Sequence, residues 1–122
     1  MTTTPTRNNY IRGDIVLVIF PNSDLRTIKS RPALIVQANN LKTGIAQVIV
    51  AMITSRTARS GHPSRVSLQR TSTVGKSSGL LSDSVIMTDN LATVSFSEIS
   101  RKIGAIEMKT VDLALRHTLE LP

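Results

Sequence analysis

The stretch IAQVIVAMIT, residues 45–54, decides how the rest of the chain can be arranged. Its β-branched and apolar residues favour a strand, and apolar side chains on both faces place such a strand in the middle of a sheet. The run PALIVQA at 32–38 is a second predicted strand, because proline is tolerated at the first position of a strand. The segment NNLKTG at 39–44, between them, has the composition of a turn. We therefore expect the two strands to lie near each other in an antiparallel sheet.

Further strands are predicted from β-branched runs, or from alternation of polar and apolar residues, between turn residues. Polar loops at 22–31, 55–64 and 70–79 separate them. Together with the strands at 32–38 and 45–54, these further strands give five or six short strands in all. These further strands are GDIVLVIFP (13–21), RVSLQ (65–69), DSVIMTD (83–89), which extends through LATVSFSEI into a single helical turn capped by Ser97 and Glu98, and RKIGAI (101–106).

One amphipathic helix is predicted at the end of the chain, because apolar residues recur there at helical spacing. Strands and helices do not alternate, which argues against a parallel α/β sheet and favours a small antiparallel barrel with one C-terminal helix. We predict one such mainly-β domain over 11–122, after a disordered arm at 1–10. The apolar side of the helix comprises Met108, Val111, Ala114, Leu115, Thr118 and Leu119, and the opposite side carries Lys109, Asp112 and Arg116.

The composition argues against several classes of protein. The chain has no cysteine, which excludes disulfides and thiolate metal sites, and His62 and His117 stand far apart among no other metal ligands. No apolar run approaches the ~20 residues of a membrane span, and the N-terminus lacks the apolar segment of a secretory signal. Only three residues are aromatic, which argues against binding single strands by base stacking. We expect a cytoplasmic protein without metal or cofactor.

Positive charge is concentrated in one half of the chain. The net charge is +7, and between Asp24 and Asp83 there are nine basic residues and no acidic one. Solvated surfaces usually mix the two signs, so this span predicts a polyanionic partner, either nucleic acid or an acidic protein segment. A basic surface kept for solubility is the alternative.

Two residues at strand ends have the chemistry to act on a phosphate. Arg31 stands directly before the strand at 32–38, and Thr54 ends the strand at 45–54, so antiparallel pairing would bring them together at one rim of the sheet. An arginine binds two phosphate oxygens with a planar fork, and RNA supplies its own nucleophile in the 2′-OH. The alternative is that Arg31 is a charge at the rim and Thr54 a strand-end cap. The chain has no GxSxG and no phosphate-binding glycine loop.

Four motifs in order resemble the MazF/PemK family of toxin endoribonucleases, over residues from about 11 to 119. The resemblance implies a small SH3-like barrel (CcdB/MazF-like) that forms a homodimer and cleaves single-stranded RNA, usually mRNA, at specific sequences without metal. It also implies 2′,3′-cyclic phosphate and 5′-OH ends, an acidic-tailed antitoxin in the RNA groove, and DNA binding by the complex. The motifs are RGDIVLVIFP (12–21), RPALIV (31–36), VIVAMIT (48–54) and GLLSDSVIMTDNLATV (79–94), with RKIGAI and the helix closing the match.

The resemblance assigns catalysis to Arg31 and Thr54, and it also identifies departures from the family. Many members have a glutamine where this chain has Asn90, and an arginine where it has Ala92. Some members use an arginine and an aspartate two residues apart on this strand as catalysts; here Asp89 remains and Met87 takes the arginine position. We predict that RNA is bound by Lys29, Ser55, Arg56, Arg59, Arg65, Asp89 and Asn90.

Two other functions fit the same barrel. One is a non-enzymatic inhibitor resembling the CcdB gyrase poisons, which would not require Arg31 or Thr54. The other is an RNA-binding barrel that has lost activity, for which Ala92 is the main argument. His62, in a polar loop before proline, is expected to be a loop residue, and Met52 and Met87 are expected to fill the core.

Overall fold

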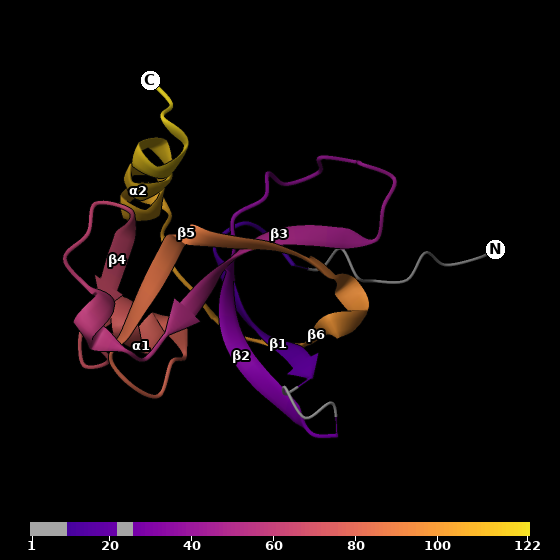
Figure 1. The fold of residues 1–122 in the computed structure, drawn as a ribbon, viewed down its shortest axis with the longest axis horizontal. Helices are drawn as coiled ribbons and strands as arrows, with labels where there is room; N and C mark the ends of the chain where they lie inside the picture. Colours follow the sequence, from indigo (N-terminus) through magenta and orange to yellow (C-terminus); the bar gives the residue numbers. More distant parts are fainter. Residues whose placement is uncertain (1–9, 22–25) are drawn as a thin grey trace.

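The computed structural model describes residues 10–21 and 26–122, and within them the chain forms one strongly curved antiparallel sheet with a helix at the C-terminal end (Figure 1). The strand order is β4-β5-β3-β2-β1-β6. The elements are β1 (Asp14–Pro21), β2 (Ile28–Ile35), β3 (Gln47–Thr54), the 3-10 turn η2 (Thr57–Arg59), β4 (Arg65–Leu68), α1 (Thr73–Ser78), β5 (Ser84–Ser95), the 3-10 turn η3 (Phe96–Glu98), β6 (Ile99–Ala105) and α2 (Lys109–Leu119).

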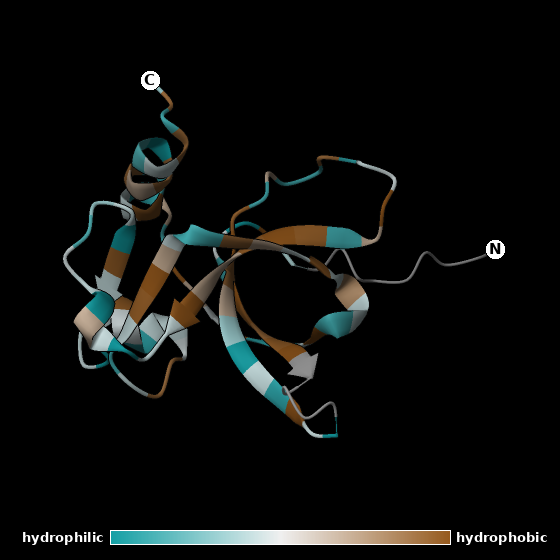
Figure 2. Cartoon of the chain, viewed as in Figure 1, coloured by the Kyte–Doolittle hydropathy of each residue, from teal (hydrophilic) through white to brown (hydrophobic). Residues whose placement is uncertain are grey.

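The central position predicted for the apolar strand at 45–54 is confirmed. β3 pairs with β2 on one side and with β5 on the other, and both of its faces are largely buried. Figure 2 shows hydrophobic colour over much of β3, whereas β2 is hydrophilic over much of its length. The prediction of a mainly-β antiparallel fold with a C-terminal helix is likewise confirmed.

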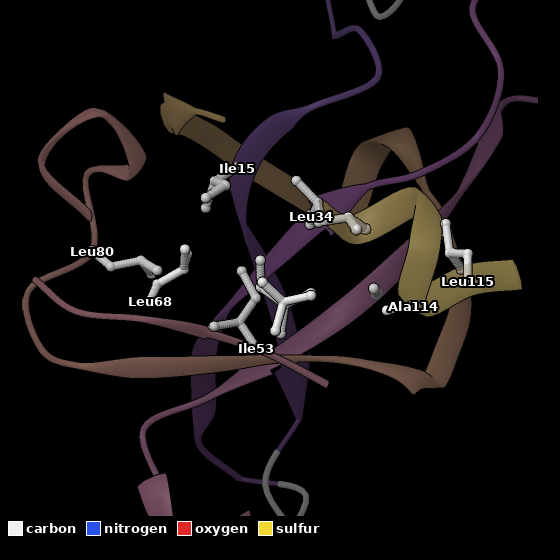
Figure 3. Packing of buried hydrophobic residues seen from close by; sticks show 11 residues of the cluster. Ile15, Leu34, Ile53, Leu68, Leu80, Ala114 and Leu115 are labelled. Atoms are coloured by element: carbon white, nitrogen blue, oxygen red, sulfur yellow. The ribbon is translucent and has the colours of Figure 1, made fainter. Parts of the chain in front are cut away.

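The two faces of the sheet carry separate apolar cores. One core lies between the sheet and α2, and Figure 3 shows Leu34, Ile53 and Leu68 of the sheet converging there with Ala114 and Leu115 of the helix. The other core fills the inside of the curved sheet, with Val18, Ala33 and Val50 fully buried.

The start of β2 differs from the prediction. We expected Arg31 to stop before the strand and Pro32 to open it, but β2 begins at Ile28 and includes both residues. Pro32 is tolerated inside the strand because the ladder of β2 with β3 covers only Ala33–Ile35, so at Pro32 the strand is paired with β1 alone and behaves as an edge. The predicted loop at 22–31 is therefore shorter, and its residues 22–25 lie outside the described part.

A short helix was missed in the predicted loop at 70–79. Ser72 caps α1 by accepting a hydrogen bond from the backbone N–H of Gly75 at 2.9 Å, and Gly79 ends the helix in the left-handed conformation. Six residues are too few for apolar periodicity to indicate a helix. The predicted helical turn near Ser97 is present as η3, but Ser95 is its cap and Glu98 completes a capping box.

The apolar side of α2 is shorter than predicted. Val111, Ala114 and Leu115 are buried against the sheet, whereas Leu119 is 50% exposed because the helix has by then run past the sheet.

At the other end of the domain, Tyr10 was predicted to lie in the arm but is half buried and stacks on Phe96 with ring centroids 6.5 Å apart. The remainder of the predicted arm, residues 1–9, lies outside the described residues. No helix in the described ranges is long and apolar enough to cross a membrane.

The end of α1 packs directly on the backbone of β6, and this contact closes the gap between the two edges of the sheet. A methyl group placed on Gly79 would lie 2.0 Å from the carbonyl oxygen of Ile103, and one on Gly104 would lie 2.3 Å from the carbonyl of Ser78. Glycine is therefore required at both positions for the two backbones to approach. The residues that follow Gly79 are held beside β6 by this contact.

We predict that Gly79→Ala destabilises the protein more than Gly44→Ala does. The two glycines have similar φ angles, +74° and +79°, but a methyl group at Gly44 meets no atom within 4 Å. Both variants carry the strain of a left-handed alanine, about 1–2 kcal/mol, and Gly79→Ala should add about 1–3 kcal/mol from the clash with Ile103. Urea unfolding measures both. Equal free energies of unfolding for the two variants would contradict the close contact.

Candidate functional site

Arg31 and Thr54 lie just beyond the end of the ladder between β2 and β3. The last pair of the ladder is Ala33 with Met52, and Arg31 and Thr54, each two residues further along its strand, line the same two hollows. Because side chains alternate along a strand, Arg31 and Thr54 leave the sheet on the same face, the one that Ala33 and Met52 share. The expected approach of these two residues at one end of the sheet is therefore present, with Arg31 inside the strand instead of before it.

Two hollows in the surface meet at this pair. The larger hollow, of about 660 Å³, is lined by residues of β2, the end of β3, the segment after α1 and β6. The smaller hollow, of about 280 Å³, is lined by Met52, Met87 and Asn90 together with basic residues. Arg31, Ile53, Thr54 and Arg56 line both. We call the two hollows together the groove.

The groove is basic, and its lining residues include no acid. Lys29, Arg31, Arg56 and Arg101 are exposed there, and none of them forms an ion pair within the described residues. The ion pairs that the structure does describe belong to Arg12, Arg65 and Lys102, which do not line the groove. Free positive charge is thus concentrated where Arg31 and Thr54 meet, as an anionic ligand requires.

Arg101 was not among the predicted site residues. β6 pairs with β1, and Leu17 is opposite Arg101, which brings this side chain to the larger hollow from the far end of the sequence. Local patterns could not reveal it, since only the pairing of the first and last strands places it near Lys29 and Arg31. The predicted residues Lys29 and Ser55 line the larger hollow, Arg59 and Asn90 the smaller one, and Arg56 lines both.

Within the described part of the chain, the hydroxyl of Thr54 has one hydrogen bond. Its Oγ1 accepts from the backbone N–H of Arg56 at 3.1 Å, which starts the turn into the loop at 55–64. The strand-end cap that we weighed as an alternative is therefore present. A hydroxyl that accepts from the backbone still has its own proton to donate, so the cap and a contact with a ligand are compatible.

A bulge in β5 brings Asp89 and Asn90 to the surface. The adjacent residues Ala51 and Met52 of β3 pair with Leu91 and Met87, so residues 88–90 of β5 have no partner in the ladder. A bulge re-aims side chains and is common beside binding sites. Asn90 consequently reaches the smaller hollow, while Asp89 is directed to β4.

Arg65 and Asp89, both predicted to bind RNA, bind each other. The Arg65 Nη2 donates to Oδ2 of Asp89 at 2.8 Å and its Nε to Oδ1 at 3.4 Å, while its Nη1 donates to the carbonyl of Arg59 at 3.1 Å. The hydrogen bond from Arg65 lowers the pKa of Asp89 below its ordinary value, and the same bond raises the pKa of Arg65. Their role in RNA binding stays a prediction, and neither lines the groove.

The two histidines, which stand far apart in the sequence, are neighbours in the fold. The ring centroids of His62 and His117 are 6.0 Å apart, in an edge-to-face arrangement between the 55–64 loop and α2. His62 Nδ1 accepts from the N–H of Ser64 at 3.0 Å, so it orders the loop as expected. Among the described residues, no three His, Cys, Asp or Glu side chains group so that they could hold a metal ion.

Three comparisons relate the chain to known proteins. The family described as PemK-like, MazF-like toxin of type II toxin-antitoxin system matches residues 11–119. A protein of Mycobacterium bovis named Endoribonuclease MazF2 is 32% identical over 105 residues, which cover 83% of this chain and 88% of that protein.

Solved structures share the fold. A mycobacterial endoribonuclease in complex with its cognate antitoxin superposes with a TM-score of 0.70 at 22% identity, covering 93% of this chain and 97% of the other. MazE–MazF from Deinococcus radiodurans gives a TM-score of 0.69 at 17% identity, covering 93% and 97%. The CcdB/MazF-like architecture expected from the sequence is thus confirmed.

We predict that the Asp89 carboxyl titrates below 3.8 and that Arg65→Met moves its pKa back toward that value. Because the pKa of Asp89 is lowered, its ion pair with Arg65 stabilises the folded state at pH values above the ordinary pKa of the carboxyl. This contribution is lost as the pH falls through the lowered pKa. NMR titration of the carboxyl carbon measures the midpoint in both proteins. A midpoint at or above 3.8 in the unmodified chain would contradict the contact.

Proposed function

This chain belongs to the PemK-like, MazF-like toxins of type II toxin–antitoxin systems, and we propose that it is an endoribonuclease whose catalytic centre is the groove at Arg31 and Thr54. The enzyme class is supported by the relatives of known name, which are called endoribonucleases. The observation that carries the proposal for the centre is the meeting of two acid-free basic hollows at one arginine and one threonine.

The proposed substrate is single-stranded RNA, usually mRNA, cut at specific sequences. The two hollows at the Arg31–Thr54 pair give room for the nucleotides before and after one phosphate. Lys29, Arg56 and Arg101 supply charge for the flanking phosphates of the strand. Ser55 and Arg59 add polar contacts at the ends of the groove, and the amide of Asn90 can hydrogen-bond to a base edge in the smaller hollow.

In the proposed reaction the RNA supplies the nucleophile. The 2′-oxygen bonds to phosphorus as the bond to the 5′-oxygen breaks, the 2′-hydroxyl loses its proton, and the 5′-oxygen takes one up. The products are a 2′,3′-cyclic phosphate and a 5′-OH, and the step consumes no water and needs no metal. The Arg31 fork neutralises charge on the pentavalent phosphorus, and Thr54 donates a hydrogen bond to one of its oxygens.

We further propose an acidic-tailed antitoxin as the protein partner in the cytoplasm. Solved relatives include an endoribonuclease in complex with its cognate antitoxin and a MazE–MazF complex. The unpaired cations of the groove would bind carboxylates as they bind phosphates, so the same surface serves both ligands.

A homodimer is also proposed, supported by the resemblance and by exposed apolar side chains on β3, β5 and α2. Ile49 and Leu91 on β3 and β5 are 36% and 37% exposed, and Leu119 near the end of α2 is 50% exposed. Light scattering should then give about 26 kDa, twice the chain mass of 13.2 kDa.

We predict that the protein cleaves a long mixed-sequence RNA in EDTA and leaves 2′,3′-cyclic phosphate ends. Arg31→Ala and Thr54→Val should each lower the cleavage rate by about 10²–10³-fold, because each removes a group that stabilises the transition state. Thr54→Ser, which keeps the hydroxyl and the cap on Arg56, should retain most activity. Arg116→Ala, which removes an exposed charge on α2, is the matched control and should cut normally.

The outcomes separate the proposed enzyme from its alternatives. Absence of cyclic-phosphate ends, or equal cutting by Arg31→Ala, would overturn the proposal. Toxicity that survives Arg31→Ala would favour a CcdB-like inhibitor. Salt-sensitive RNA binding without cleavage would favour an RNA-binding barrel that has lost activity.

A further inference from the structure

We propose that Arg65 and Asp89 form a positioning pair that holds the 55–64 loop against the groove, and that neither contacts the RNA. This inference rests on the proposed function, because the loop matters for catalysis only if the groove binds RNA. It replaces the role in RNA binding that the sequence indicated for both residues.

The guanidinium of Arg65 is occupied by three contacts within the fold. Two of its nitrogens donate to the carboxylate of Asp89, and the third donates to the carbonyl oxygen of Arg59 at 3.1 Å. Arg65 comes from β4, Asp89 from the bulge of β5, and Arg59 from η2, so one side chain joins two strands and a loop. A guanidinium fork that is engaged in this way has little capacity left for a phosphate.

The 55–64 loop, which Arg65 connects to β4 and β5, lines part of the groove. Arg56 and Arg59 line the smaller hollow, and Nη1 of Arg59 lies 3.7 Å from the sulfur of Met87, which also lines it. Because Arg65 holds the carbonyl of Arg59, it fixes the backbone from which the Arg59 side chain extends. The 3-10 turn is itself short, with the N–H of Arg59 donating to the carbonyl of Arg56 at 3.0 Å.

Other contacts hold the loop mainly at its two ends. Thr54 caps the start through the N–H of Arg56. At the far end the carbonyl of Ser64 accepts from both the N–H and the hydroxyl of Thr88, at 3.0 and 2.6 Å. Between these ends, η2 is tied to the sheet by Arg65 and by the contact of Arg59 with Met87. Loss of Arg65 would therefore free the segment that carries the groove arginines while leaving the loop attached.

The two hypotheses differ in what the charge of Asp89 does to the loop. If Asp89 contacted the RNA, removing its charge would change RNA affinity, upward beside a phosphate or downward beside a base that donates to it, and would leave the loop in place. If Asp89 instead holds Arg65 in place, removing its charge releases the loop and lowers activity. The side chains of Arg65 and Asp89 are 25% and 32% exposed, and partly exposed ion pairs of this kind stabilise a fold only slightly.

The test compares Asp89→Asn, Arg65→Met and the double variant with the unmodified chain. We expect each single variant to lower kcat/KM for a mixed-sequence RNA by about tenfold to a hundredfold, as displaced active-site groups do. The double variant should be no worse than either single one, because both remove the same interaction. Thermal unfolding midpoints should remain close to that of the unmodified chain.

Asp112→Asn is the matched control. Asp112 lies on α2, outside the groove, and is ion-paired with Arg12. The same chemical change at Asp112 should leave RNA cleavage unaltered. A conservative variant, Arg65→Lys, keeps the charge but cannot reach both Asp89 and Arg59 with a planar fork. It should therefore remain impaired, whereas a residue that only supplied charge to phosphate would tolerate lysine.

Hydrogen exchange keeps the inference separate from the proposed enzyme function. In Asp89→Asn the amides of Arg59 and Ser60 should exchange faster, while amides of β3 and β5 keep their protection. If the unmodified chain does not cleave RNA, the proposed function fails and this exchange result still decides whether the pair holds the loop. Unchanged exchange at Arg59 and Ser60, higher RNA affinity of Asp89→Asn, or additive losses in the double variant would each overturn the inference.

Discussion

The antiparallel register of β2 against β3 is the constraint on which the site depends. Both faces of these strands are packed, so a slip of one residue would turn Leu34 away from the helix-side core and direct Arg31 toward it. Burying an unpaired guanidinium is far more costly than any gain such a slip could offer. The apolar residues that fix the core therefore also fix which hydroxyl faces which guanidinium.

Much of the fold was predictable because it is encoded in apolar patterns of adequate length. The central strand, the C-terminal helix and the antiparallel class all follow from runs that only one arrangement can bury. What escaped prediction was short or depended on pairing. α1 has six residues and is held by a cap and by backbone contact with β6, neither of which produces a periodic pattern. The early start of β2 depends on its partner β1, which extends past β3.

The candidate site likewise contains residues that local sequence predicts and residues that only long-range pairing brings together. Arg31 directly precedes one predicted strand and Thr54 ends the next, so elementary rules of antiparallel pairing predict that they lie together, although Arg31 is in fact part of β2. Arg101 and the contact of His62 with His117 depend on which distant elements become neighbours, and local sequence carries no such information. Arg65 and Asp89 are predicted to bind RNA because their charges are visible in the sequence, whereas the ion pair between them is not.

The pairing of β1 with β6 also bears on the order in which the groove is assembled. β1 is hydrogen-bonded to β2 on one side and to β6 on the other, so β1 receives its second neighbour only after residues 99–105 have been synthesised. Contacts between residues so distant in sequence form late, since closing a long loop must precede them. On a ribosome, Arg31 and Thr54 can meet while the wall that carries Arg101 has yet to emerge. A nascent chain therefore has an incomplete groove until β6 has been synthesised.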